Sequence, residues 1–296
     1  MTNPTDIESS TASVPSTSNP TLGERMSLWF GLAGDRTVKF KSWDAIEETA
    51  LSRALYEGRG KMEGGRVGKK ISITLSHMCT ELAGAKFWEE TDDGYKQVMN
   101  ELEREAHIRR MWETDVLIAY FLLRIDALGD PFVKLQVPSP FDPLGKRLVI
   151  WKGDISGAEM FGSENVEDAF WDYELRRPFK IRGKIASKFC MGPLRWATAD
   201  SLQFQTKPYE AKLRGILGSI QLIPDVSMSA STSYTLADLG RLHKTDIEAI
   251  TAEIESRQHG MDLEIECYDP EAEQTFKTAL PWIHPDFFGA SSQFPD

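Results

Sequence analysis

The spacing of apolar residues changes twice along this chain, from helical to alternating and back to helical. One helical face between residues 92 and 110 carries five apolar side chains: Tyr95, Val98, Met99, Leu102 and Ala106. Residues 133–137 instead alternate apolar and polar side chains, which is typical of a strand with one buried face. Helices, then strands, then helices favour an α+β fold, with an antiparallel sheet packed against helices, over alternating βαβ units.

The same patterns predict the individual elements. Helices are predicted over residues 43–56, 92–110, 114–129, 167–175, 236–243 and 245–257. Strands are predicted over residues 71–75, 133–137, 147–151, 179–189, 215–223, 226–230 and 261–267. The helix over 114–129 should end at Gly129, because glycine readily adopts the left-handed conformation found after a helix C-terminus.

The first 24 residues differ in composition from the rest of the chain. They are rich in Ser and Thr, contain Pro4, Pro15 and Pro20, and carry few apolar side chains. Such a segment buries too little apolar surface to offset the entropy lost on ordering. We therefore expect a flexible N-terminal arm over residues 1–24 and a single α+β domain over residues 25–296.

Composition excludes several classes of protein. The 296 residues are 41% hydrophobic and 27% charged, which excludes a disordered chain, a coiled-coil rod, a collagen and a disulfide scaffold. No C-x-x-C pair exists, and the longest apolar run, residues 116–123, is too short to cross a bilayer. The N-terminus lacks the apolar stretch of a signal peptide. We expect an intracellular protein, cytoplasmic or nuclear, with no transmembrane segment, metal or cofactor.

A basic segment interrupts a chain whose formal net charge is −11. Read as one strand over residues 179–189, it places four apolar side chains on one face: Phe179, Ile181, Ile185 and Phe189. The opposite face, with two preceding arginines, would display a row of cations: Arg176, Arg177, Lys180, Arg182, Lys184 and Lys188. Trp196 lies just beyond and could offer a stacking surface to a base.

Three interpretations of this basic segment remain open. The row could bind a polyanion, such as nucleic acid or anionic lipid headgroups, with an affinity that falls as salt rises. It could instead be half of a charge ladder, because the predicted strand 261–267 carries acids at alternate positions: Asp262, Glu264 and Glu266. An acidic protein partner is the third interpretation.

A Gly-rich basic stretch, residues 58–70, is the second candidate anion site. It is not a Walker A loop, because Glu63 stands where the first glycine belongs and Lys70 replaces the hydroxyl that binds magnesium. The predicted strand that follows would also provide no helix N-terminus for a phosphate. A cationic loop could still contact phosphates through its basic residues: Arg59, Lys61, Arg66, Lys69 and Lys70.

Catalytic motifs are absent from the sequence. No pair of histidines has the spacing of a metal site, and His107 is best explained by a solvated face of a charged helix. The segment around Ser156 resembles a serine nucleophile loop only faintly, because it lacks the G-x-S-x-G spacing. We do not expect an enzyme, although a site assembled from distant residues stays an alternative.

These patterns together predict a non-enzymatic binding or assembly protein. It would engage nucleic acid or an anionic membrane surface through the basic strand and the Gly-rich loop, with possible self-association. The order of elements is loosely similar to that of matrix proteins from some negative-strand RNA viruses, which implies a viral structural or transport component. The alternatives are an enzyme acting on a phosphorylated substrate and a protein–protein interaction module.

Overall fold

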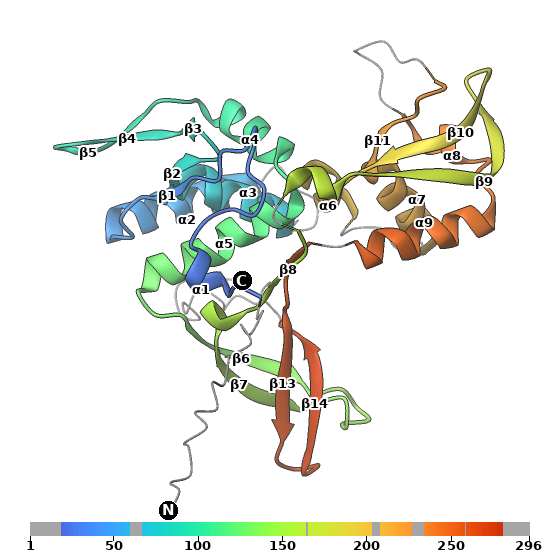
Figure 1. The fold of residues 1–296 in the computed structure, drawn as a ribbon. Coiled ribbons are helices and arrows are strands. Elements are labelled where there is room, and N and C mark those ends of the chain that lie inside the picture. Colours follow the sequence, from blue (N-terminus) through green and yellow to red (C-terminus); the bar gives the residue numbers. More distant parts are fainter. Residues whose placement is uncertain are drawn as a thin grey trace, which may run out of the picture.

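The computed structural model describes residues 19–59, 67–163, 165–202, 208–226, 234–257 and 259–280. Helices and antiparallel strand pairs make up this part of the chain, which confirms the α+β class (Figure 1). Most of the predicted arm, residues 1–18, lies outside the described residues. The remainder contains a short helix, α1 (Leu22–Arg25), which Thr21 and Glu24 cap reciprocally and which buries Leu22 completely.

The apolar interior of the described residues forms two clusters, and the larger one is built around side chains from a group of helices. Its helices are α2 (Ala45–Arg59), α3 (Val67–Met78), α4 (Glu101–Arg110) and α5 (Glu113–Leu128). Small antiparallel strands flank them: β1 (Val38–Phe40), β2 (Cys79–Leu82), β3 (Ala85–Lys86), β4 (Trp88–Thr91) and β5 (Gly94–Gln97). Gly129 ends α5 with a φ of 57°, as the sequence predicts.

Helix α3 replaces the strand predicted over residues 71–75. The alternation of Ile71, Ile73 and Leu75 was misleading, because Ser72 and Thr74 between them are also buried. Ser72 donates to the Gly68 carbonyl at 2.9 Å, so its hydroxyl is satisfied by the helix itself. Six consecutive residues of α3, 71–76, are buried, so the alternation of apolar and polar residue types does not mark a strand with one buried face.

Two hairpins pack together below the helices of the larger cluster (Figure 1). One consists of β6 (Phe132–Pro138) and β7 (Leu148–Asp154), and the other of β13 (Glu264–Asp269) and β14 (Gln274–Ala279). Both bury alternate residues, as period-two sequences should. The buried faces meet in the larger cluster through six side chains: Val133, Leu135, Val137, Val149, Ile265 and Cys267.

The smaller cluster combines a three-stranded sheet with helices. Its strands are β9 (Trp171–Ile181), β10 (Lys184–Met191) and β11 (Ile220–Leu222), in the order β11-β10-β9. Its helices are α7 (Pro208–Ser219), α8 (Leu236–Leu239) and α9 (Lys244–Ser256), and α6 (Trp196–Leu202) leads from the sheet toward α7. His243 caps α9, because its ring nitrogen accepts the Thr245 N–H.

The segment predicted as one strand over residues 179–189 is a hairpin instead. Arg182 and Gly183 form its turn with φ values of 48° and 87°, and β9 pairs with β10 on either side. Two consecutive positive φ angles are the mark of the tight turns that match the twist of β-hairpins. The basic side chains therefore belong to two strands and do not form one continuous row.

Other predicted elements have different boundaries or types. The first part of the helix predicted over 92–110 is β5. The helix predicted over 167–175 is instead a 3-10 turn, η2 (Val166–Ala169), followed by the start of β9. The strand predicted over 215–223 is mostly α7. A second 3-10 turn, η1 (Ile155–Gly157), follows β7, and β8 (Met160–Phe161) pairs with β12 (Gly260–Met261). Residues 227–230 of the last predicted strand before α8 lie outside the described residues.

Within the described residues, we find no helix with the length and apolar character needed to cross a bilayer.

Candidate functional site

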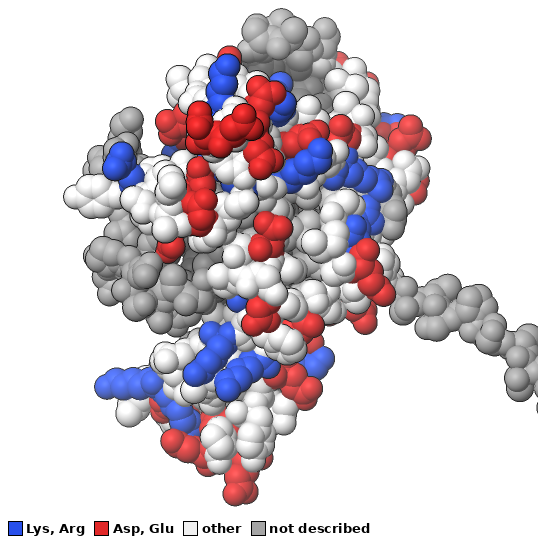
Figure 2. Space-filling model, turned by 90° about the vertical axis from the view of Figure 1, so that its left-hand side faces the viewer, with Lys and Arg blue, Asp and Glu red and all other residues white. Residues whose placement is uncertain are grey.

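Charged side chains are unevenly distributed over the surface. Figure 2 shows acidic side chains gathered over the upper part of one face, and a group of Lys and Arg side chains with further acids around it on the lower part. The lower part is where the hairpins β6–β7 and β13–β14 lie in Figure 1. The position of each predicted cation decides which surface could bind an anion.

Most of the Gly-rich stretch, residues 60–66, lies outside the described residues. Lys61, Arg66 and the side chain of Arg59 lie outside the described residues. Lys69 forms an ion pair with Glu105, whereas Lys70 is exposed on α3. The expectation that a strand follows this stretch was wrong, because α3 follows it. The argument against a Walker A loop therefore rests on the sequence alone, in which Glu63 and Lys70 occupy the positions of the first glycine and of the magnesium-binding hydroxyl.

Acids and other partners engage half of the predicted cations in the basic segment. Arg182 pairs with Asp238 at 2.7 Å, Lys188 pairs with Asp172, and Arg177 contacts the His243 ring at 2.8 Å. The neighbouring ion pairs raise the pKa of Arg182 and Lys188, because each carboxylate favours the charged form of its partner. The remaining three cations are exposed: Arg176, Lys180 and Lys184.

The outer face of β9–β10 is mixed in charge rather than cationic. Lys188 lies directly opposite Glu174 in the register, so acids and cations share that face. A shift of register between Ala186 and Lys188 also turns Ile185 outward, where it is 65% exposed. The prediction that Ile185 faces a core was therefore wrong.

The charge ladder with the acidic strand does not form. Strand β13 pairs with β14, and β9 pairs with β10, so the two predicted partners belong to different sheets. Glu264 pairs instead with Lys277 on β14 at 2.6 Å.

Two aromatic residues considered in the sequence are buried. Trp196 is 0% exposed and its indole N–H donates to the Ser72 hydroxyl at 2.8 Å, so it offers no face to a base. His107 was expected on a solvated helix face but is 7% exposed, with Nε2 2.9 Å from the Leu82 carbonyl. Burial lowers the pKa of His107, since the charged imidazolium loses hydration there.

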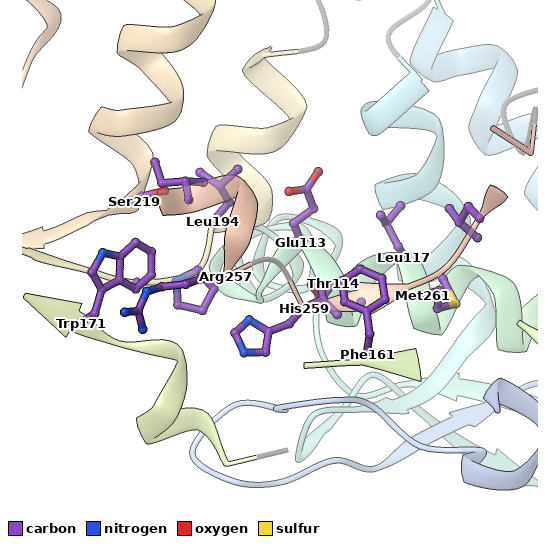
Figure 3. Close-up of a pocket in the computed structure, with 15 residues that line it drawn as sticks. Glu113, Thr114, Leu117, Phe161, Trp171, Leu194, Ser219, Arg257, His259 and Met261 are labelled. Atoms are coloured by element: carbon purple, nitrogen blue, oxygen red, sulfur yellow. Dashed lines mark hydrogen bonds between the residues drawn. The ribbon is translucent and has the colours of Figure 1, made fainter. Parts of the chain in front are cut away.

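A cavity of about 260 Å³ lies where the two apolar clusters meet. Figure 3 shows Trp171 and Arg257 at one end, Leu117, Phe161 and Met261 at the other, and Glu113 and His259 between them. The Glu113 carboxyl and the His259 ring extend away from each other, so they do not form an acid–base pair. The described residues also contain no cluster of three side chains able to hold a metal ion.

The outer face of β6–β7 carries the cationic surface that the sequence interpretation missed. Lys134 lies directly opposite Lys152 in the antiparallel register, and both side chains are exposed. Neither ammonium group has a hydrogen-bond or ion-pair partner among the described residues. Further toward the loop, the same face carries Ile150, 58% exposed, and Leu148, 50% exposed.

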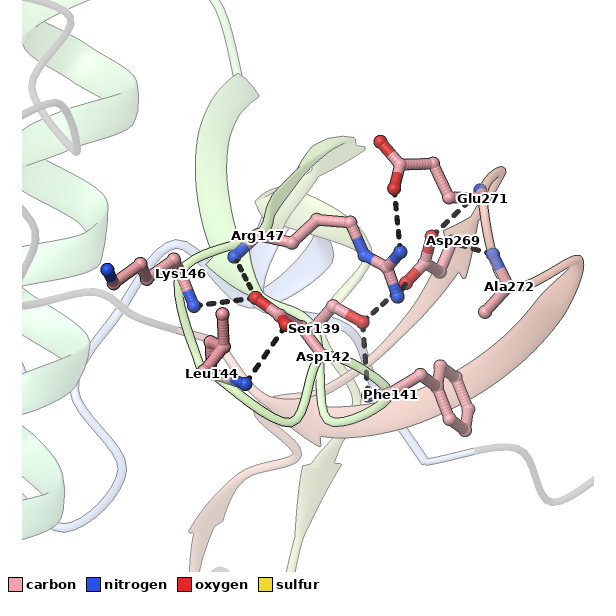
Figure 4. Close-up of polar contacts among 9 residues, drawn as sticks. All are labelled: Ser139, Phe141, Asp142, Leu144, Lys146, Arg147, Asp269, Glu271 and Ala272. Carbon is pink, nitrogen blue, oxygen red and sulfur yellow. Dashed lines mark hydrogen bonds and ion pairs between the residues drawn. The ribbon is translucent and has the colours of Figure 1, made fainter.

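The loop that joins these strands extends the same combination of groups. It contains Leu144, 76% exposed, and the exposed Lys146. The Asp142 carboxylate accepts N–H groups from Leu144, Lys146 and Arg147, which fixes the loop (Figure 4). These three hydrogen bonds lower the pKa of Asp142, because they favour its charged form.

A polar network ties this loop to the turn between β13 and β14. The fully buried Asp269 carboxylate accepts a hydrogen bond from the Ser139 hydroxyl and forms an ion pair with Arg147 at 2.9 Å (Figure 4). Arg147 forms a second ion pair with Glu271 at 2.7 Å. Burial acts to raise the pKa of Asp269, but these partners together lower it. The two hairpins are thereby held as one unit.

Sequence reasoning could have found the β6–β7 face. The alternation over 133–137 assigns Lys134 to the outer side correctly, and residues 147–151 were correctly predicted to be a strand. What was missing is the register, because only the pairing of the two strands brings Lys134 and Lys152 together.

No family model, curated protein or solved structure matches this chain. The similarity to viral matrix proteins therefore remains a prediction from the order of elements.

Proposed function

We propose that this chain is a non-enzymatic binding protein that attaches to anionic membrane surfaces through the outer face of β6–β7. The observation that carries this proposal is the exposed pair Lys134 and Lys152, directly opposite each other and beside Ile150 and Leu148. Like charges in directly opposed positions destabilise a hairpin. An external anion is the simplest partner that would turn this repulsion into attraction.

The apolar side chains favour a lipid surface over nucleic acid. A bilayer interface offers anionic headgroups to the lysines and, about 5–10 Å deeper, an apolar layer to Ile150 and Leu148. Nucleic-acid bases stack on aromatic rings rather than on aliphatic side chains. The same face also carries one exposed aromatic ring, Phe132, which can enter a bilayer interface as Ile150 and Leu148 do. Two aliphatic side chains beside a single ring fit a lipid surface better than a row of stacked bases.

The acidic net charge does not oppose such binding strongly. Charges farther than about 8 Å from the interface are largely screened at physiological ionic strength. The acids on the upper part of the molecule lie on other elements, whereas Lys134, Lys146 and Lys152 belong to one hairpin (Figure 2). Local charge at the contact thus decides the interaction.

The proposal is tested by sedimentation of the full chain with vesicles of phosphatidylcholine, with and without phosphatidylserine. We expect binding only to the anionic vesicles, and weaker binding as salt rises. The variant Lys134→Gln/Lys152→Gln should need about 30 times more lipid for half-saturation, from about 1 kcal/mol for each lysine. The matched control, Lys180→Gln/Lys184→Gln, removes the same charge from exposed residues of β9–β10 and should bind normally.

Two further arms separate the alternatives. Leu148→Ser/Ile150→Ser keeps the net charge and should still weaken binding severalfold if apolar side chains enter the interface. If Lys180→Gln/Lys184→Gln weakens vesicle binding as much as Lys134→Gln/Lys152→Gln does, the net charge of the chain rather than the β6–β7 face determines binding, and the proposal is refuted. Binding of single-stranded RNA that exceeds vesicle binding, and is lost in Lys134→Gln/Lys152→Gln, would replace lipid with nucleic acid.

A further inference from the structure

The cavity between the two apolar clusters contains a carboxyl group that has no partner among the described residues. Glu113, the first residue of α5, lines the cavity. Its backbone N–H donates to the Leu194 carbonyl at 2.9 Å, whereas its side chain makes no hydrogen bond or ion pair among the described residues. Burial raises the pKa of Glu113 to about 7, and no neighbouring cation counteracts it. The Glu113 side chain is half-buried, and a carboxylate withdrawn from water without a counter-charge is unfavourable, so a positively charged ligand group would stabilise it.

A second polar group in the cavity wall is also without a partner. Ser219, the last residue of α7, is 1% exposed, and its hydroxyl makes no hydrogen bond. Buried hydroxyls nearly always have a hydrogen-bond partner, so this one calls for an acceptor or donor that the protein does not supply. It lines the same cavity as Glu113, from the other apolar cluster (Figure 3).

The guanidinium of Arg257 does not provide the missing charge. Its Nε bonds to the Glu253 carboxylate at 2.6 Å, and the side chain is exposed beside the Trp171 ring. The remaining lining is dominated by apolar and aromatic side chains: Leu117, Phe161, Trp171, Leu194, Ile254, Met261 and Leu263. Aromatic faces attract cations and also pack against apolar rings.

We propose that this cavity binds a small apolar primary amine, whose ammonium group pairs with Glu113 and hydrogen-bonds to Ser219 while its apolar part packs against the apolar and aromatic side chains of the lining. An ammonium group donates three hydrogen bonds, so it can satisfy both polar groups at once. Binding sites for larger ligands usually measure about 300–1,000 Å³. The volume of about 260 Å³ therefore fits one ring with a short chain rather than a peptide or nucleotide.

The test is calorimetric titration of the full chain with benzylamine and phenethylamine. Two probes of similar shape, benzyl alcohol and phenylacetate, replace the ammonium by a neutral group and by an anion. We expect the amines to bind at least tenfold more tightly than either, and the preference to disappear in Glu113→Gln. Ser219→Ala should weaken amine binding severalfold, and Leu117→Phe should exclude every probe by filling the cavity.

Each alternative outcome overturns the proposal. Equal affinity for amine and alcohol would make the cavity an apolar site without charge recognition. Amine binding that survives in Glu113→Gln would place the amine elsewhere, and no binding by any probe would remove the site. Thermal melting of each variant shows whether it is folded, and Glu113→Gln preserves the shape of the side chain.

Discussion

At the scale of single residues, buried acids bind backbone amides and fix the course of loops. The clearest case is Asp115 on α5, which is 0% exposed. Its carboxylate accepts the N–H groups of Trp29, Phe30 and Gly31 at 2.6, 2.9 and 2.8 Å. One side chain therefore satisfies three consecutive amides of a segment more than 80 positions away in the sequence.

We expect Asp115→Ala to be among the most destabilising single substitutions in this chain. It leaves three buried amides without an acceptor, at about 1–3 kcal/mol for each unsatisfied group, so a loss of about 3–5 kcal/mol is expected. Urea denaturation measures it. Asp126→Ala, on an exposed position of the same helix, is the control and should change stability by less than about 0.5 kcal/mol. Similar losses in both variants would contradict this role of Asp115.

At the scale of elements, the sequence predicts those with a long apolar run or a clean alternation and fails where polar residues are buried among apolar ones. Helix α5 follows from the apolar run of residues 116–123 and from Gly129, and strands β6 and β7 follow from their alternation. Helix α3 could not be predicted, because its Ser and Thr side chains are buried too and leave an alternating pattern. The β9–β10 turn could have been suspected from Gly183, which has a φ of 87°.

The candidate site shows the same limit. The sequence identifies cations but not their partners, which come from distant segments: Asp238 for Arg182, and Glu105 for Lys69. Neither pair has a spacing that local patterns could reveal. The cavity was also beyond prediction, because Glu113 and Ser219 come to line one cavity only through packing of the two apolar clusters.

The pair Lys134 and Lys152 should limit the stability of its own hairpin. In Lys152→Glu an acid faces Lys134 across the strands, and we expect a gain of about 0.2–1 kcal/mol in the free energy of unfolding. The same variant should bind anionic vesicles more weakly than the unmodified chain. Lys134→Glu/Lys152→Glu restores like charges and should lose the gain. A decrease in stability for Lys152→Glu would show that the lysines do not repel each other appreciably.

At the scale of the whole molecule, the two apolar clusters meet around the Glu113 carboxyl, so their contact should depend on pH. The pKa of Glu113 is raised from 4.5 to about 7 by burial, so the folded chain binds a proton that the unfolded chain releases between these values. Stability from this group is complete below about pH 4.5 and declines as pH rises through 7.

We therefore expect Glu113→Gln to change how stability varies with pH. The unmodified chain should lose up to about 3 kcal/mol from this group between pH 5 and 8, and the Gln variant should not. Urea denaturation at several pH values measures the difference between the two curves, which cancels contributions from other groups such as His259. Parallel curves would mean that the carboxyl is hydrated in solution.

The polar network around Asp269 gives the proposed membrane face a geometric consequence. Because Ser139 and Arg147 fasten one hairpin to the other, the lysine-bearing strands are held in a fixed direction relative to the body. Every copy bound to an anionic bilayer would then have the same orientation. A dense layer of bound molecules would be asymmetric, with the β6–β7 lysines against the lipid and the acidic upper part facing the solution.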